Sequence, residues 1–71
     1  MTKEEALEAM ETHRVHHPLM DYDWVTKCTD GRYYNSDGYS ANEYQMREEI
    51  DSCDDWNNGW ELIPNSERSV G

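Results

Sequence analysis

The sequence predicts a small α+β domain. The chain has 71 residues, which sets one domain as the upper limit. Two segments place apolar side chains at helical spacing behind capping residues, and β-branched or aromatic segments lie between and after them. The expected order is helix, strand, strand, helix, strand, and this mixture is typical of an α+β fold.

The first helix is predicted to begin after Thr2. The hydroxyl of Thr2 and the carboxylate of Glu5 have the spacing of a capping box, and a narrow apolar stripe follows. Pro18 disfavours the α conformation in the residue before it. We therefore expect this helix to end between His13 and His16.

A β-hairpin is expected next, after a linker over residues 17–22. Residues 23–28 (DWVTKC) contain β-branched residues in an alternating pattern, which favours a strand. The Asp-Gly pair in TDGR is a strong signal for a tight turn, so residues 32–35 (RYYN) form the returning strand. A second turn is expected at NSDG, residues 35–38.

The second helix is predicted over residues 41–53, behind a capping box made by Ser40 and Glu43. Its apolar stripe consists of Met46, Ile50 and Cys53. The sequence NNG, residues 57–59, provides residues that end helices. A short third strand, WELI, is expected over residues 60–63. The domain then spans residues 1–64, and residues 65–71 form a frayed polar tail.

Charge excludes several classes of partner. Sixteen acids stand against six bases, so the formal net charge is −10. Direct binding to nucleic acid and to anionic membranes is not expected, because both need Lys and Arg contacts. The N-terminus lacks the apolar core of a signal peptide, and no stretch of the chain could span a bilayer. We therefore expect a cytoplasmic protein with reduced cysteines and a basic protein as partner.

The second helix concentrates this charge. On a helix with ~100° per residue, Tyr44, Glu48, Asp51 and Asp55 fall within roughly 60° of one another. A solvated face would explain their position, yet such faces usually mix charges, and Arg47 is the only base here. Spacings of three and four residues give axial steps of ~4.5–6 Å, a plausible pitch for imitating backbone phosphates.

We therefore predict a partner-binding surface on this helix and the loops around it. Trp56 is included because polar residues surround it in the sequence, as they do many interface anchors. Trp24 and Trp60, in predicted strands, are expected in the core. The predicted contact residues are Tyr44, Glu48, Asp51, Asp54, Asp55 and Trp56, joined by Asp21, Asp23, Asp30 and Asp37 from the loops.

The sequence contains few features that would indicate catalysis or cofactor binding. The sequence has no nucleophile elbow, phosphate loop or HExxH motif, so no enzyme and no cofactor are predicted. His13 and His17 are four residues apart, and with Cys28 and Cys53 they could complete a tetrahedral zinc site. The chain lacks a paired Cys-x-x-Cys knuckle, so a zinc-stabilised domain is kept as an alternative only.

In size, acidity, aromatic-rich core and lack of catalytic motifs, the chain resembles small acidic phage-encoded early proteins that disarm host enzymes. Anti-restriction proteins, uracil-DNA glycosylase inhibitors and some anti-CRISPR proteins share this style. The resemblance is compositional. It implies a DNA-mimic inhibitor that acts in a bacterial cytoplasm on a host nucleic-acid-handling enzyme. The alternative is a structural or regulatory subunit, including a homodimer, that docks through its apolar surface or a sheet edge.

Overall fold

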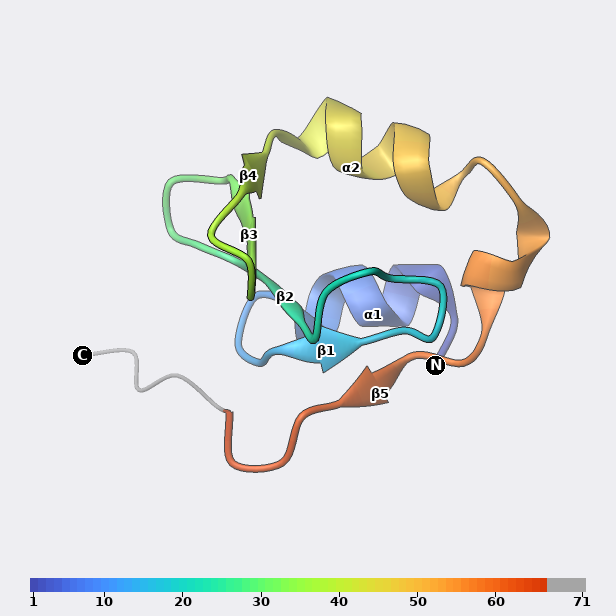
Figure 1. Ribbon diagram of the computed structural model, residues 1–71, viewed down its shortest axis with the longest axis horizontal. Helices are drawn as coiled ribbons and strands as arrows, with labels where there is room; N and C mark the ends of the chain where they lie inside the picture. Colours follow the sequence, from blue (N-terminus) through green and yellow to red (C-terminus); the bar gives the residue numbers. More distant parts are fainter. Residues whose placement is uncertain (67–71) are drawn as a thin grey trace.

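The computed structural model describes residues 1–66, in which two α-helices, one 3-10 helix and five short strands form an α+β fold (Figure 1). In chain order these are α1 (Lys3–Ala9), β1 (Val15–His16), β2 (Val25–Lys27), β3 (Tyr33–Asn35), β4 (Ser40–Ala41), α2 (Glu43–Ile50), the 3-10 helix η1 (Asp54–Asn57) and β5 (Glu61–Leu62). The predicted α+β class is confirmed. The sequence did not predict β1, β4 or η1.

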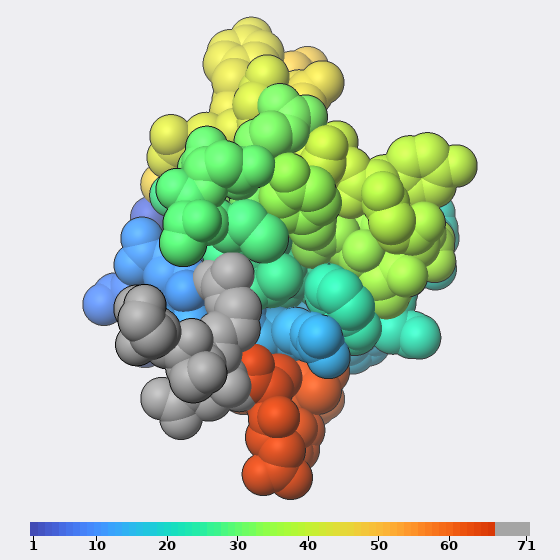
Figure 2. Space-filling view, turned by 90° about the vertical axis from the view of Figure 1, so that its left-hand side faces the viewer, coloured from blue at the N-terminus to red at the C-terminus, as the bar shows by residue number. Residues whose placement is uncertain are grey.

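The strands form one antiparallel sheet in the order β4-β3-β2-β1-β5. The predicted hairpin is its centre, with Val25 opposite Asn35 and Lys27 opposite Tyr33. Both predicted turns are present, since Gly31 and Gly38 have positive φ angles of 83° and 88°. In Figure 2, the green hairpin lies between the yellow residues of α2 and the orange-red residues of the β5 region.

The first helix is shorter than predicted. The Thr2–Glu5 capping box is confirmed, but α1 ends at Ala9. The reason lies in β2: the hydroxyl of Thr26 lies 2.9 Å from the Met10 carbonyl oxygen and 2.8 Å from that of His13. These contacts bind the end of α1 to the sheet, and the chain is then extended in β1.

The boundaries of the second helix also differ from the prediction. The capping box is formed by Asn42 and Gln45, because Ser40 pairs with Tyr34 in the sheet. The helix ends at Ile50, and the hydroxyl of Ser52 donates to the Glu49 carbonyl oxygen 2.6 Å away. Cys53 is consequently extended and exposed, so it is not part of the apolar stripe.

One core joins the helices, the sheet and η1. Its two tryptophans replace aliphatic residues, since each large aromatic side chain can bury ~150–250 Å². The buried apolar residues are Ala6, Leu7, Met10, Val15, Met20, Val25, Tyr33, Met46, Ile50, Trp56 and Trp60.

None of the helices within residues 1–66 is both long enough and apolar enough to span a membrane. The predicted tail falls mostly on residues 67–71, which lie outside the described residues. Ser66, at its start, accepts a hydrogen bond from the Arg14 backbone N–H at 3.0 Å.

Candidate partner-binding surface

Helix α2 carries two of the predicted contact residues at exposed positions. Tyr44 and Glu48 are four residues apart on one helical face, and the Tyr44 side chain is 76% exposed. Asp54 and Asp55 follow on η1 and are also exposed. The carboxylates of Glu48, Asp54 and Asp55 make no hydrogen bond or ion pair with other residues in the described part of the chain. We call Tyr44, Glu48, Asp54 and Asp55 the α2–η1 acidic face.

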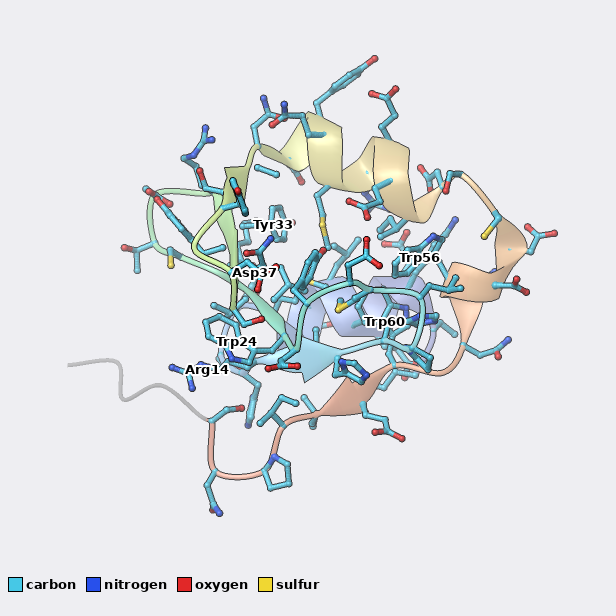
Figure 3. The ribbon with its side chains drawn as sticks, in the orientation of Figure 1. Arg14, Trp24, Tyr33, Asp37, Trp56 and Trp60 are labelled. Atoms are coloured by element: carbon cyan, nitrogen blue, oxygen red, sulfur yellow. The ribbon has the colours of Figure 1, made fainter. Side chains whose placement is uncertain are left out.

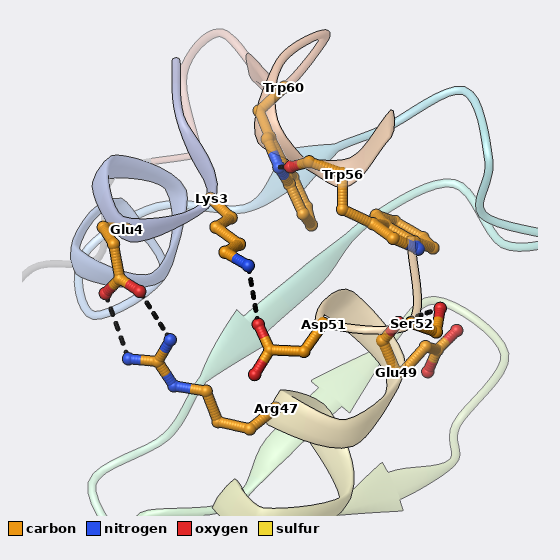
Figure 4. Close-up of polar contacts among 8 residues, drawn as sticks. All are labelled: Lys3, Glu4, Arg47, Glu49, Asp51, Ser52, Trp56 and Trp60. Carbon is orange, nitrogen blue, oxygen red and sulfur yellow. Dashed lines mark hydrogen bonds and ion pairs between the residues drawn. The ribbon is translucent and has the colours of Figure 1, made fainter. Parts of the chain in front are cut away.

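Asp51, another predicted contact residue, is not part of this face because it forms an ion pair within the molecule. Its carboxylate lies 2.7 Å from the Lys3 ammonium on α1, and this hydrogen bond lowers the pKa of the carboxyl group (Figure 4). One helical turn earlier, Arg47 makes two hydrogen bonds to Glu4, the shorter at 2.5 Å. Together these two ion pairs hold α1 and α2 together, so Asp51 has a structural partner within the chain.

The prediction that Trp56 is a contact residue is wrong. Its side chain is 6% exposed, and its ring lies 4.6 Å from that of His17 and 5.5 Å from that of Trp60. The Trp60 indole N–H donates to the Trp56 carbonyl oxygen at 2.5 Å. Both rings point into the core (Figure 3). Polar neighbours in the sequence suggested that Trp56 is exposed. In η1, however, these neighbours face outward and the tryptophan faces inward.

The four candidate zinc ligands do not form a site. Within residues 1–66, no group of three or more His, Cys, Asp or Glu side chains could hold a metal ion. His17 is buried, and its Nε2 lies 2.7 Å from the Asn58 carbonyl oxygen, while its Nδ1 accepts from the Leu19 backbone N–H at 3.1 Å. His13 bonds Thr12, and Cys28 and Cys53 are free thiols.

Two of the loop acids have roles within their own turns. Asp30 accepts from the Arg32 backbone N–H and from the Tyr34 hydroxyl, both at 2.9 Å, and these bonds lower the pKa of its carboxyl group. The exposed Asp37 lies in the β3–β4 turn, where its backbone N–H donates to the Asn35 side chain. Asp30 therefore helps to fix its turn, while the carboxylate of Asp37 faces solvent.

The other two loop acids lie in the segment between β1 and β2. Asp23 is exposed, and its backbone N–H donates to the Ser36 hydroxyl at 2.7 Å, which joins this segment to the β3–β4 turn. Asp21 is exposed and, like Glu49 of α2, disfavours ionisation of Tyr22. Burial, followed by these two charges, raises the pKa of Tyr22 to about 12. Asp21 in the loop and Glu49 on α2 thus both raise the pKa of Tyr22.

Around that tyrosine the surface is hollowed. The hollow has a volume of about 150 Å³ and lies among the β1–β2 loop, β2, β3, β4 and α2. Tyr33 is buried in it, Tyr22 is half-buried, and Tyr39 is 73% exposed. Its lining residues are Tyr22, Val25, Tyr33, Asn35, Tyr39, Ser40, Ala41, Met46 and Glu49. We call this the tyrosine hollow. The sequence did not predict it, because it is built by segments that lie apart along the chain.

The described basic side chains all have contacts within the molecule. Lys3 and Arg47 bind acids of the opposite helix. The Arg14 guanidinium lies 4.4 Å from the centre of the Trp24 ring, and the Lys27 ammonium lies 5.6 Å from that of Tyr33 (Figure 3). Arg32 donates to the Ser40 hydroxyl at 3.0 Å.

A second acidic region, on α1, was also missed. Glu4, Glu5, Glu8 and Glu11 share a hollow of about 370 Å³ with Glu43 of α2, and Lys27 and Arg47 also line it. This region carries both signs of charge, unlike the α2–η1 acidic face. Its signal in the sequence is the repeated glutamate of the first helix, of which only Glu5 was given a role, in the capping box.

No protein-family model, curated protein or solved structure matches this chain.

Proposed function

We propose that this chain is a protein-binding module that occupies a basic, nucleic-acid-binding surface of a partner protein and blocks it. The observation that carries the proposal is the division of charge. The five described bases are engaged within the molecule, whereas Glu48, Asp54 and Asp55 present carboxylates without a partner among residues 1–66.

An unpartnered acidic surface is costly to the fold and favourable to a basic partner. Like charges repel in the folded state, while the same field speeds association with a surface of opposite sign. The α2–η1 acidic face adds a 76%-exposed tyrosine, Tyr44, to three carboxylates. Tyrosine is frequent among residues that dominate interface energies. A partner that normally binds phosphates would offer the required Lys and Arg.

The resemblance to phage-encoded inhibitors supports the choice of target class. It implies a host enzyme that handles nucleic acid, met in the bacterial cytoplasm, and a non-catalytic role for this chain. Docking through a sheet edge is less favoured, because the edge strands β4 and β5 have two residues each and so offer few backbone groups for pairing.

The test is affinity capture from a bacterial lysate at about 50 mM and about 300 mM NaCl, followed by a competition assay. We expect to capture a nucleic-acid-binding protein at the lower salt and to lose most of it at the higher salt. The purified partner should release a labelled DNA or RNA when this chain is added. Retention of the partner at high salt, or no displacement of nucleic acid, would refute the proposal.

A charge-reversal variant tests the face itself. Glu48→Lys, Asp54→Lys and Asp55→Lys together should abolish capture, because the three side chains are exposed and have no partner in the part of the chain that the structure describes. The matched control is Glu8→Lys, Glu43→Lys and Glu61→Lys, which makes the same change in net charge at exposed positions that are not among the predicted contacts. Equal loss in both variants would show that net charge alone, rather than this face, drives binding.

A further inference from the structure

We infer that the tyrosine hollow receives an arginine side chain of the partner protein. This inference rests on the proposed function, since it names one contact through which the chain would bind a basic partner. Three properties of the hollow support it: aromatic walls, an acid without a counter-ion at the rim, and a size suited to one planar cationic group.

Tyrosines from three segments supply the walls. Tyr33 comes from β3, Tyr22 from the β1–β2 loop and Tyr39 from the end of the β3–β4 turn. A guanidinium placed over a tyrosine face within ~6 Å of the ring centre is attracted by the ring quadrupole. The molecule uses this type of contact elsewhere, where Arg14 lies 4.4 Å over Trp24.

Glu49 supplies the charge. Its carboxylate has no hydrogen bond or ion pair within residues 1–66, and none of the residues that line the hollow is a base. Two other polar side chains of the lining already accept hydrogen bonds: the Asn35 amide oxygen accepts from two backbone N–H groups, and the Ser40 hydroxyl accepts from Arg32. Glu49 is the one acid among the residues that line the hollow, so it supplies the negative charge that a cation would meet.

The size fits one side chain. A cavity of about 150 Å³ in another protein holds one benzene molecule, which is planar and similar in extent to a guanidinium with its adjoining methylene. Arginine satisfies both parts of the lining, because its planar group stacks on aromatic rings and donates to a carboxylate. Arginine is also enriched among the residues that dominate interface energies.

The first experiment is an NMR titration of this chain with acetyl-Gly-Arg-Gly-amide and, separately, with the uncharged acetyl-Gly-citrulline-Gly-amide. We expect saturable shifts at Tyr22, Tyr39 and Glu49 with the arginine peptide, in roughly the millimolar range. Citrulline has nearly the same shape without the charge and should give much smaller shifts. Equal shifts from both peptides, or shifts centred elsewhere, would overturn the inference.

Two variant pairs sharpen the test. Glu49→Gln should weaken arginine-peptide binding by about two- to fivefold, whereas Glu61→Gln removes the same charge at an exposed position outside the hollow and should leave binding unchanged. Tyr39→Ala should weaken it by about two- to fivefold, whereas Leu62→Ala truncates an exposed large side chain outside the hollow and should not. Loss in both members of a pair would contradict a specific role for the hollow.

The peptide titration and the partner capture fail independently. If the peptides do not bind but salt-sensitive capture of a nucleic-acid-binding protein succeeds, the hollow is not the arginine site and the proposed function stands. If the arginine peptide binds as expected but capture fails, the proposed function falls, and the hollow is then a cation site without that role.

Discussion

At the scale of single residues, His17 is a buried polar side chain that takes part in both core packing and hydrogen bonding. Its ring packs against those of Trp56 and Trp60, with centroid distances of 4.6 and 4.9 Å, and its two nitrogens face backbone groups of Leu19, Asp55 and Asn58. Because Nδ1 accepts from an N–H, Nε2 carries the proton and donates. His17 thereby joins the β1–β2 loop to η1.

Replacing His17 by alanine should therefore remove packing and hydrogen bonds together. We expect His17→Ala to lower the free energy of unfolding by about 2–4 kcal/mol, a large part of the roughly 3–5 kcal/mol expected for a domain of this size. Urea unfolding followed by tryptophan fluorescence measures this change. His16→Ala is the control, since His16 is only half-buried and should cost less than about 1 kcal/mol. Equal losses would contradict this role of His17.

Gly59 shows how little room surrounds this histidine. Its φ angle is +94°, and a Cβ atom added there would lie 3.3 Å from His17 Nε2. Both the backbone conformation and the close contact explain a glycine at this position. The sequence NNG predicted only the end of a helix. The second reason for a glycine, the close approach of His17, follows from the tertiary fold.

At the scale of elements, the two ion pairs between α1 and α2 make stability depend on acidic pH. The bonded Arg47 and Lys3 lower the pKa of Glu4 from 4.5 and that of Asp51 from 3.8. A carboxyl group with a lowered pKa in the folded state stabilises the fold above its ordinary pKa, and this contribution is lost as the pH falls through the lowered value.

The test compares the wild-type chain with the variant Glu4→Gln/Asp51→Asn by thermal unfolding across pH. We expect a higher midpoint for the wild type between about pH 5.5 and 8, and convergence of the two curves as the pH falls below the carboxyl range. Glu48→Gln/Asp54→Asn makes the same charge change without losing an internal partner and should not lower the midpoint. A constant gap at all pH values would show that the ion pairs are not its cause.

The sequence predicted which elements exist better than where they end. The hairpin and both turns were predicted because β-branched residues and Asp-Gly pairs act locally. Helix ends and the strands β1 and β4 depend on partners distant in the chain, such as Thr26 at the end of α1 and Tyr34 beside Ser40. The candidate surface was likewise predictable only in part. The exposure of Tyr44, Glu48, Asp54 and Asp55 follows from local helical structure. The burial of Trp56 and the tyrosine hollow depend on the tertiary fold, so the sequence did not predict them.

At the scale of the whole molecule, the net charge of −10 affects both the stability of the fold and the binding of a basic partner, and salt should change the two in opposite directions. Repulsion among the acids opposes the compact state, and salt screens exposed charges over a Debye length of roughly 10 Å at 0.1 M. The two ion pairs are screened as well, but they are few beside the excess of acids. Added NaCl should therefore stabilise the fold while it weakens binding to a basic partner.

We expect the thermal unfolding midpoint to rise by several degrees between about 20 and about 300 mM NaCl, at roughly 4–8 °C for each kcal/mol of relieved repulsion. Over the same range the captured partner should dissociate. The variant Glu48→Gln/Asp54→Asn/Asp55→Asn carries three fewer negative charges, so its midpoint should rise less. A midpoint that falls with salt would mean that the ion pairs outweigh the repulsion. In that case the acidic surface would not be costly to the fold, and a basic partner would gain nothing from relieving its repulsion.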